Sequence, residues 1–208
     1  MTIPGGCKHL NAKEFTKRVN ALQSDDELRK IQRYFPFKDG KQPKDDYFIG
    51  VKMGELFKLG KEFSDMPVGE IEKLMESRVH EIRAGAMSIM GQCAKGKKCS
   101  EERLQDLYKL YIRRHDRINN WDLVDLASYY VVGKYLADKP RDILYKLARS
   151  KNMWERRSAI LATVPSRQVE SMSSCGTAAA APSLSPARYL SWISAACFSY
   201  PMRCASWL

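Results

Sequence analysis

The segment NNWDLVDLA, residues 119–127, places one indole and two carboxylates within five positions of a chain whose formal net charge is +11. A carboxylate can stabilise positive charge that develops beside it and can orient a water molecule. Helical spacing separates the two acids, because residues four apart are neighbours on a helix surface. Asp125 therefore lies beside Trp121. Asp122 points elsewhere and lies in the first turn, where the helix dipole favours a carboxylate.

The pair of Trp121 and Asp125 has two interpretations. It is a candidate site for chemistry on a cationic group, or it is an ordinary half-buried tryptophan next to a solvated acid. Successive residues of a helix are 100° apart around its axis. This spacing predicts that one side of the helix faces the core and that Trp121 and Asp125 lie together on a different side. The predicted core side contains Leu123, Val124, Ala127 and Val131, and the other side contains Ser128 and Val132 as well.

A second indole lies in NMWERRSAI, residues 152–160. Trp154 and Arg157 are three apart and share a helix face with Leu161, whereas Arg156 points about 100° away. An aromatic ring beside a guanidinium is suited to grip sugar and phosphate, because arginine binds phosphate through two bonds and stacks on flat surfaces. The same pairing is also common in plain packing between helices.

The elements that must position these residues are predicted to be helices. In residues 47–63, Ile49, Met53, Leu56, Gly60 and Phe63 follow spacings of four and three, which places them on one helix face. Ser24, Ser100 and Asn119 or Asn120 are suitable N-caps, and Pro67 and Pro140 suit first turns. Further amphipathic runs cover residues 11–23, 25–35, 66–77, 80–95, 100–115, 119–136, 140–149 and 152–164.

This pattern predicts an all-α fold, since no alternating strand pattern of useful length competes with it. Helices of roughly 10 to 18 residues joined by short turns indicate stacked antiparallel pairs. These pairs form either a HEAT-like curved solenoid or an irregular bundle. No clear sequence repeat decides between the two.

The charge is concentrated in the first part of the chain. Of the net +11, three arginines and one glutamate after residue 164 contribute +2, so residues 1–164 carry +9. Clustered lysine and arginine gain affinity for phosphates by releasing condensed counterions, which favours nucleic acid as a partner. A well-solvated surface or an acidic protein partner explains the charge equally well.

The composition changes after residue 164. Residues 165–208 contain no lysine and are rich in Ser, Ala, Pro and Cys, and they include Trp192 and Trp207. We therefore expect one main domain over residues 1–164 and a low-complexity tail over residues 165–208. Aromatic residues are unusual in a solvated linker, and translation in a shifted reading frame would produce such a tail.

Several classes of function have no support in the sequence. Six cysteines form no CxxC pair and the three histidines show no metal-ligand spacing, so we expect reduced thiols, no metal and no cofactor. A serine nucleophile turn is also missing. No apolar run is long enough for a membrane span, and the N-terminus has no signal-peptide core. We expect a cytoplasmic monomer with no membrane partner.

Three segments together show a family resemblance. YFIGVKMGELFKLGKEF, INNWDLVDLASYYVVGKYL and LARSKNMWERRSAILATV, in this order and spacing, resemble the AlkD-like DNA alkylation repair family of DNA glycosylases. The resemblance covers roughly residues 10–164. It implies HEAT-like helix pairs whose basic concave surface holds duplex DNA, and excision of cationic N-alkylated purines such as 3-methyladenine and 7-methylguanine.

The resemblance also implies roles for individual residues. Asp125 matches the catalytic acid, which stabilises the charge that develops on the deoxyribose and orients water. Trp121 matches an indole packed against the backbone of the lesion, and Arg157 matches an arginine that contacts phosphate. Tyr34 matches an aromatic residue that lines the cleft. An Asp125 enclosed in an internal ion pair would argue against this enzymatic interpretation.

The resemblance stops short of the family's full length. Family members continue past the W-x-R-R helix with further helices, one of which carries a tryptophan and an arginine that complete the cleft. Here the tail of residues 165–208 takes their place, so the chain is expected to be truncated. Two alternatives to a glycosylase stay open: a non-catalytic basic module that binds DNA or another polyanion, and an inactive truncated family member.

Overall fold

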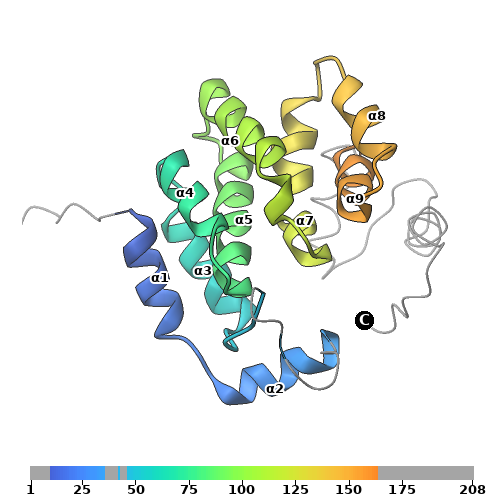
Figure 1. Ribbon diagram of the computed structural model, residues 1–208. Coiled ribbons are helices and arrows are strands. Elements are labelled where there is room, and N and C mark those ends of the chain that lie inside the picture. The colour runs from blue at the N-terminus through green and yellow to red at the C-terminus, as the bar shows by residue number, and fades with distance from the viewer. Residues whose placement is uncertain (1–9, 36–41, 43–45, 164–208) are drawn as a thin grey trace, which may run out of the picture.

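The computed structural model describes residues 10–35, 42 and 46–163, and within these residues the protein is all-α (Figure 1). The side chains of residues 32–34 and the predicted tail over 165–208 lie outside the described part. In the described part of the chain, two shorter helices accompany the α-helices, the 3-10 helix η2 (His115–Arg117) and the π-helix η3 (Tyr129–Gly133). The α-helices are α1 (Ala12–Asn20), α2 (Asp25–Tyr34), α3 (Met53–Glu62), α4 (Val68–Met75), α5 (His80–Lys95), α6 (Glu101–Arg113), α7 (Trp121–Ser128), α8 (Asp142–Ala148) and α9 (Met153–Ala162).

Helix α5 is the centre of this arrangement. It packs against α3 and α4, which precede it in the chain, and against α7, which follows it. Every residue of α5 is buried except Gln92 and Lys95. Figure 1 shows α1 and α9 at opposite ends of the row of helices, with α5 between them. The grouping of these helices into HEAT-like pairs of a curved solenoid stays a prediction.

Two glycines allow the neighbours of α5 to approach closely. A Cβ added at Gly91 of α5 would lie 2.3 Å from the backbone oxygen of Leu126 in α7. A Cβ added at Gly60 of α3 would lie 2.6 Å from the hydroxyl of Ser88 in α5. Both distances are far shorter than van der Waals contact. The helix that carries Asp125 is thus held directly against the backbone of the central helix.

Three predicted N-caps are confirmed. The side chains of Ser24, Ser100 and Asn120 accept hydrogen bonds from backbone N–H groups at the starts of α2, α6 and α7. Pro67 is the N-cap of α4 instead of its first residue, and Pro140 comes two residues before α8 begins. The caps at Ser24 and Asn120 fix where α2 and α7 begin, the helices that carry Tyr34, Trp121 and Asp125.

The prediction of one helix face from Ile49 to Phe63 is wrong at its start. Helix α3 begins at Met53, and Tyr47 forms an isolated parallel bridge with Val79. Gly50 has a φ of 81°, a conformation that interrupts a right-handed helix. The carboxylate of Glu81 accepts bonds from the N–H groups of residues 49–51 at 2.8 to 3.3 Å, so the extended backbone is satisfied without a helix.

The predicted core side of α7 is confirmed, because Leu123, Val124, Ala127 and Val131 are all fully buried. Ser128 and Val132 are fully buried too, although the spacing places them on the side of Trp121 and Asp125. Helix α9 covers this second side, and the Ser128 hydroxyl donates to the backbone oxygen of Ser158 at 2.9 Å.

Within the described residues, no helix is long and apolar enough to cross a membrane.

Candidate functional site

Asp125 and Arg157 form an ion pair between α7 and α9. Arg157 donates through Nε to one carboxylate oxygen and through Nη2 to the other, both at 2.8 Å. Such a two-bond arrangement fixes the plane of the carboxylate as well as its position. The pair is not internal, because the side chains of Asp125 and Arg157 are 36% and 24% exposed. The predicted acid and the predicted phosphate-binding arginine are thus direct partners.

Trp121 begins α7 one turn before Asp125, as the helical spacing predicts. Its ring stacks on Phe35, with ring centroids 5.8 Å apart and planes 7° from parallel. Phe35 also contacts Phe48 at 4.8 Å between centroids. The indole is half-buried at the edge of an aromatic cluster, and this cluster holds the start of α7 against the segment that follows α2.

The other two predicted aromatic residues, Trp154 and Tyr34, lie on α9 and α2. Trp154 is half-buried on α9 and packs against the hydrophobic core, as does Leu161 on the same helix. Arg156 donates to the backbone oxygens of Ser150 and Lys151 in the preceding loop, whereas Arg157 pairs with Asp125. Tyr34 is the last residue of α2, and its side chain lies outside the described part of the structure.

A half-open hollow of about 180 Å³ adjoins Asp125. Its walls come from α3, α5, α7 and η3. Asp125 is one lining residue, and the others are Phe57, Ser88, Gly91, Gln92, Lys95, Leu126 and Tyr130. The hollow therefore combines an acid, a lysine, an amide and two aromatic rings at the place where α7 crosses the central helix.

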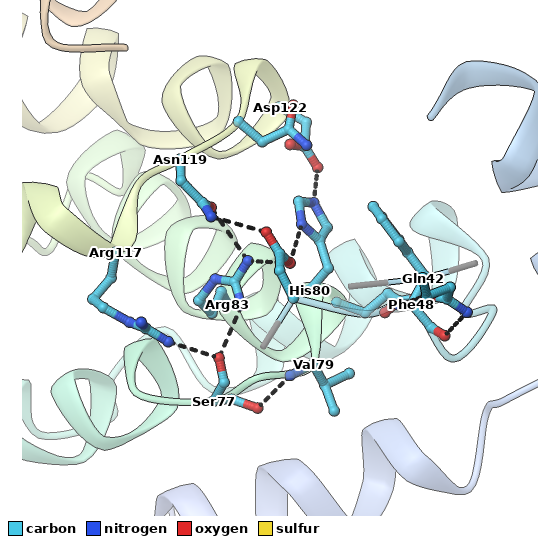
Figure 2. A network of polar contacts seen from close by, with 12 residues as sticks. Gln42, Phe48, Ser77, Val79, His80, Arg83, Arg117, Asn119 and Asp122 are labelled. Carbon is cyan, nitrogen blue, oxygen red and sulfur yellow. Dashed lines mark hydrogen bonds and ion pairs between the residues drawn. The ribbon is translucent and has the colours of Figure 1, made fainter. Parts of the chain in front are cut away.

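A buried polar network anchors the first turn of α7 to α5 (Figure 2). Nε2 of His80 lies 2.7 Å from Oδ2 of Asp122, and Nδ1 lies 3.6 Å from Oδ1 of Asp46. Burial disfavours the charged ring, but the hydrogen bond to Asp122 and the nearby carboxylate of Asp46 outweigh it and raise the pKa of His80 to about 9. A protonated His80 can donate from both ring nitrogens. Asp122 is therefore more than a helix-start residue.

Arg83 and Asn119 extend the network on the side of Asp46. Arg83 is 2% exposed and donates to Asp46 at 2.6 Å and to the backbone oxygen of Ser77 at 2.9 Å. Asn119 donates to the other oxygen of Asp46 at 2.8 Å. Burial alone would raise the pKa of Asp46, but the nearby His80 ring and the hydrogen bond from Arg83 hold this pKa well below its usual range. The network fixes the loop before α7 from two sides.

Helix α9 is fixed by a second buried cluster around Ser158. The Ser158 hydroxyl lies 2.8 Å from the hydroxyl of Tyr111 and 2.9 Å from Nε2 of His115. Burial lowers the pKa of His115, and it raises the pKa of Tyr111 above its usual range. His115 is therefore held neutral and can accept one bond through a ring nitrogen. The cluster sets α9, and hence Arg157, against α6 and α7.

The sequence reasoning missed these supporting residues. One signal was present: His80, Glu81 and Arg83 are polar residues at the start of a long run of small and apolar residues. Charged side chains are almost never buried without partners, so such a cluster in a core helix indicates a polar network.

Among the described residues, no group of three or more His, Cys, Asp or Glu side chains could hold a metal ion.

The fold and site define an all-α protein with a paired acid and guanidinium beside a hollow that contains a lysine. The chain belongs to the DNA alkylation repair enzyme family, whose sequence profile matches residues 15–181. The match includes every described helix from α2 onward and extends past residue 164. No curated protein and no solved structure gives a significant match.

Proposed function

We propose that the chain is a DNA glycosylase that releases positively charged N-alkylated purines from duplex DNA. Lesions of the 3-methyladenine and 7-methylguanine type are the substrate class. One observation carries this proposal within a DNA alkylation repair family. The carboxylate of Asp125 is partly exposed at the edge of a hollow and is held in a fixed plane by two bonds from Arg157.

The reaction needs little from the protein at the purine. A cationic purine leaves as a neutral base when the N-glycosidic bond breaks with its electron pair, so positive charge develops on the deoxyribose. Asp125 stabilises that charge and accepts a proton from the attacking water. Because the carboxylate is already oriented in the free protein, it needs no reorganisation during the reaction.

Arg157 serves two partners in this proposal. A guanidinium has five N–H donors, which is more than one carboxylate accepts, so an arginine bonded to Asp125 can also donate to a backbone phosphate. Such an arrangement places the phosphate near the acid. The exposed face of the pair is the side from which the duplex approaches.

The test is release of methylated purines from alkylated duplex DNA by purified protein. Asp125→Asn keeps the size of the side chain and removes its charge, so we expect release to fall by at least 100-fold while duplex binding persists. Asp106→Asn is the matched control, because Asp106 is exposed on α6 away from the hollow. Equal release by the wild type and the Asp125→Asn variant would overturn the proposal.

A second candidate is a basic helical module that binds DNA without catalysis. The observation that favours it is that both oxygens of Asp125 accept from Arg157, as they would in a purely structural link between α7 and α9. A binder of this kind shows no purine release in the wild type. The same assay therefore separates the two candidates.

A further inference from the structure

The central helix α5 reaches the surface at one place within the described structure. Gln92 and Lys95 are its two residues that are not buried, and both line the hollow beside Asp125. This helix is buried along the rest of its length, and it exposes only these two side chains to solvent, next to the candidate acid. Neither residue is assigned a role in the reaction proposed above.

Lys95 has an unusual setting for a surface lysine. Its Nζ lies 5.5 Å from the ring centroid of Tyr130, which is within the range of a cation–π contact. Within the described residues it pairs with no carboxylate, whereas Lys58, Lys73 and Lys139 each pair with a glutamate. Asp125, which lines the same hollow, pairs with Arg157 instead. The positive charge of Lys95 is thus placed at the hollow without a neutralising partner in the described part.

The rest of the lining suits part of a nucleic-acid strand. Phe57 and Tyr130 offer aromatic faces, and Gln92 offers an amide that both donates and accepts. Aromatic rings beside an unpaired cation are the usual composition of surfaces that hold sugar, base and phosphate. Pockets that enclose a whole drug-sized ligand measure roughly 300 to 1,000 Å³. At about 180 Å³ and open on one side, the hollow fits a segment of a longer ligand better.

We propose that the hollow is a nucleotide subsite for the residue that flanks the lesion. Lys95 binds the backbone phosphate of this nucleotide, and the rings of Tyr130 and Phe57 contact its sugar. The subsite rests on the proposed function, because it takes the strand whose damaged nucleotide lies at Asp125. It extends the contact surface from the pair of Asp125 and Arg157, across α7, to the end of α5.

The first experiment measures duplex binding against salt concentration for Lys95→Gln. One phosphate contact contributes about 0.9 to the slope of log K against log salt, so we expect the slope to fall by about that amount. The loss of affinity between 50 and 200 mM salt then becomes about 3.5-fold smaller than in the wild type. Lys97→Gln is the matched control, since Lys97 is exposed just after α5 and does not line the hollow.

The second experiment locates the phosphate. Duplexes that carry a single neutral methylphosphonate at successive positions around one lesion analogue are titrated with wild type and Lys95→Gln. At one position, a single nucleotide from the lesion, the neutral linkage weakens wild-type binding and has no further effect on the variant. At the remaining positions it weakens both proteins equally. If the neutral linkage weakens binding of the wild type and of Lys95→Gln equally at every flanking position, the subsite is wrong.

The outcomes keep the two proposals apart. If Lys95→Gln and Lys97→Gln change the salt slope equally while Asp125→Asn abolishes release, the subsite is wrong and the glycosylase proposal stands. If the methylphosphonate coupling is present but the wild type releases no purine, the glycosylase proposal is wrong and Lys95 is a DNA contact of a binding module. Because Lys95 is exposed, its replacement is not expected to impair folding.

Discussion

Replacing Gly91 by alanine tests whether the close crossing of α5 and α7 positions the site. The added Cβ would lie 2.3 Å from the backbone oxygen of Leu126, where ordinary contact needs at least 3.4 Å. The two helices must therefore separate by about 1 Å, and because the clash is with backbone that cannot turn aside, the overpacking costs about 3 kcal/mol. Alanine recovers about 1 kcal/mol through its higher helix propensity. The expected net loss is about 2 kcal/mol.

Thermal unfolding followed by circular dichroism measures this effect. For a chain of this size, a loss of about 2 kcal/mol lowers Tm by roughly 4 to 8 °C. Gly69→Ala is the control, because Gly69 lies in α4 and an added Cβ would meet nothing within 4 Å. This variant should be as stable as the wild type or slightly more so. The reasoning is refuted if Gly91→Ala unfolds at the same temperature as Gly69→Ala.

Three further predictions concern the groups that support the site. The raised pKa of His80 stabilises the fold fully below pH 6.5, and this contribution, at most about 3 kcal/mol, is lost as pH rises through about 9. Urea unfolding between pH 6.5 and 9 should show the decline in wild type and a flatter profile in His80→Gln. Ser158→Ala leaves two buried partners unsatisfied and should cost about 2 to 4 kcal/mol in the same assay, and an unchanged midpoint would contradict the cluster. Glu81→Gln replaces a carboxylate oxygen that accepts from residues 49–51 and should cost about 1 to 3 kcal/mol, whereas Asp106→Asn on the exposed side of α6 should cost nothing measurable.

The sequence predicted the helices well where each one carries its own signals. Helix α5 occupies residues 80–95 as its pattern indicates, and the caps at Ser24 and Ser100 mark true helix starts. Periodicity and capping are local properties, so they can be recognised without knowledge of the partner helices. The spacing also placed Trp121 and Asp125 one turn apart on α7.

The missed features depend on contacts between distant parts of the chain. Glu81 binds the backbone of residues 49–51, and nothing in the local sequence shows that this segment has a carboxylate partner about 30 residues away. The pairing of Asp125 with Arg157 likewise joins α7 to α9 across 32 positions. Helical spacing gives the face on which a side chain lies, but packing decides what covers that face. Ser128, which is buried under α9, illustrates the difference.

The nearly complete burial of α5 has a consequence for how the molecule comes apart. In a stack where each unit contacts only the units on either side of it, one end can unfold while the rest stays folded. Here α3, α4 and α7 all cover one central helix, so the loss of any of them exposes its apolar side chains to water. Melting is therefore expected to be a single all-or-none transition across residues 53–133, and proteolytic fragments that lack α7 should not persist as folded species.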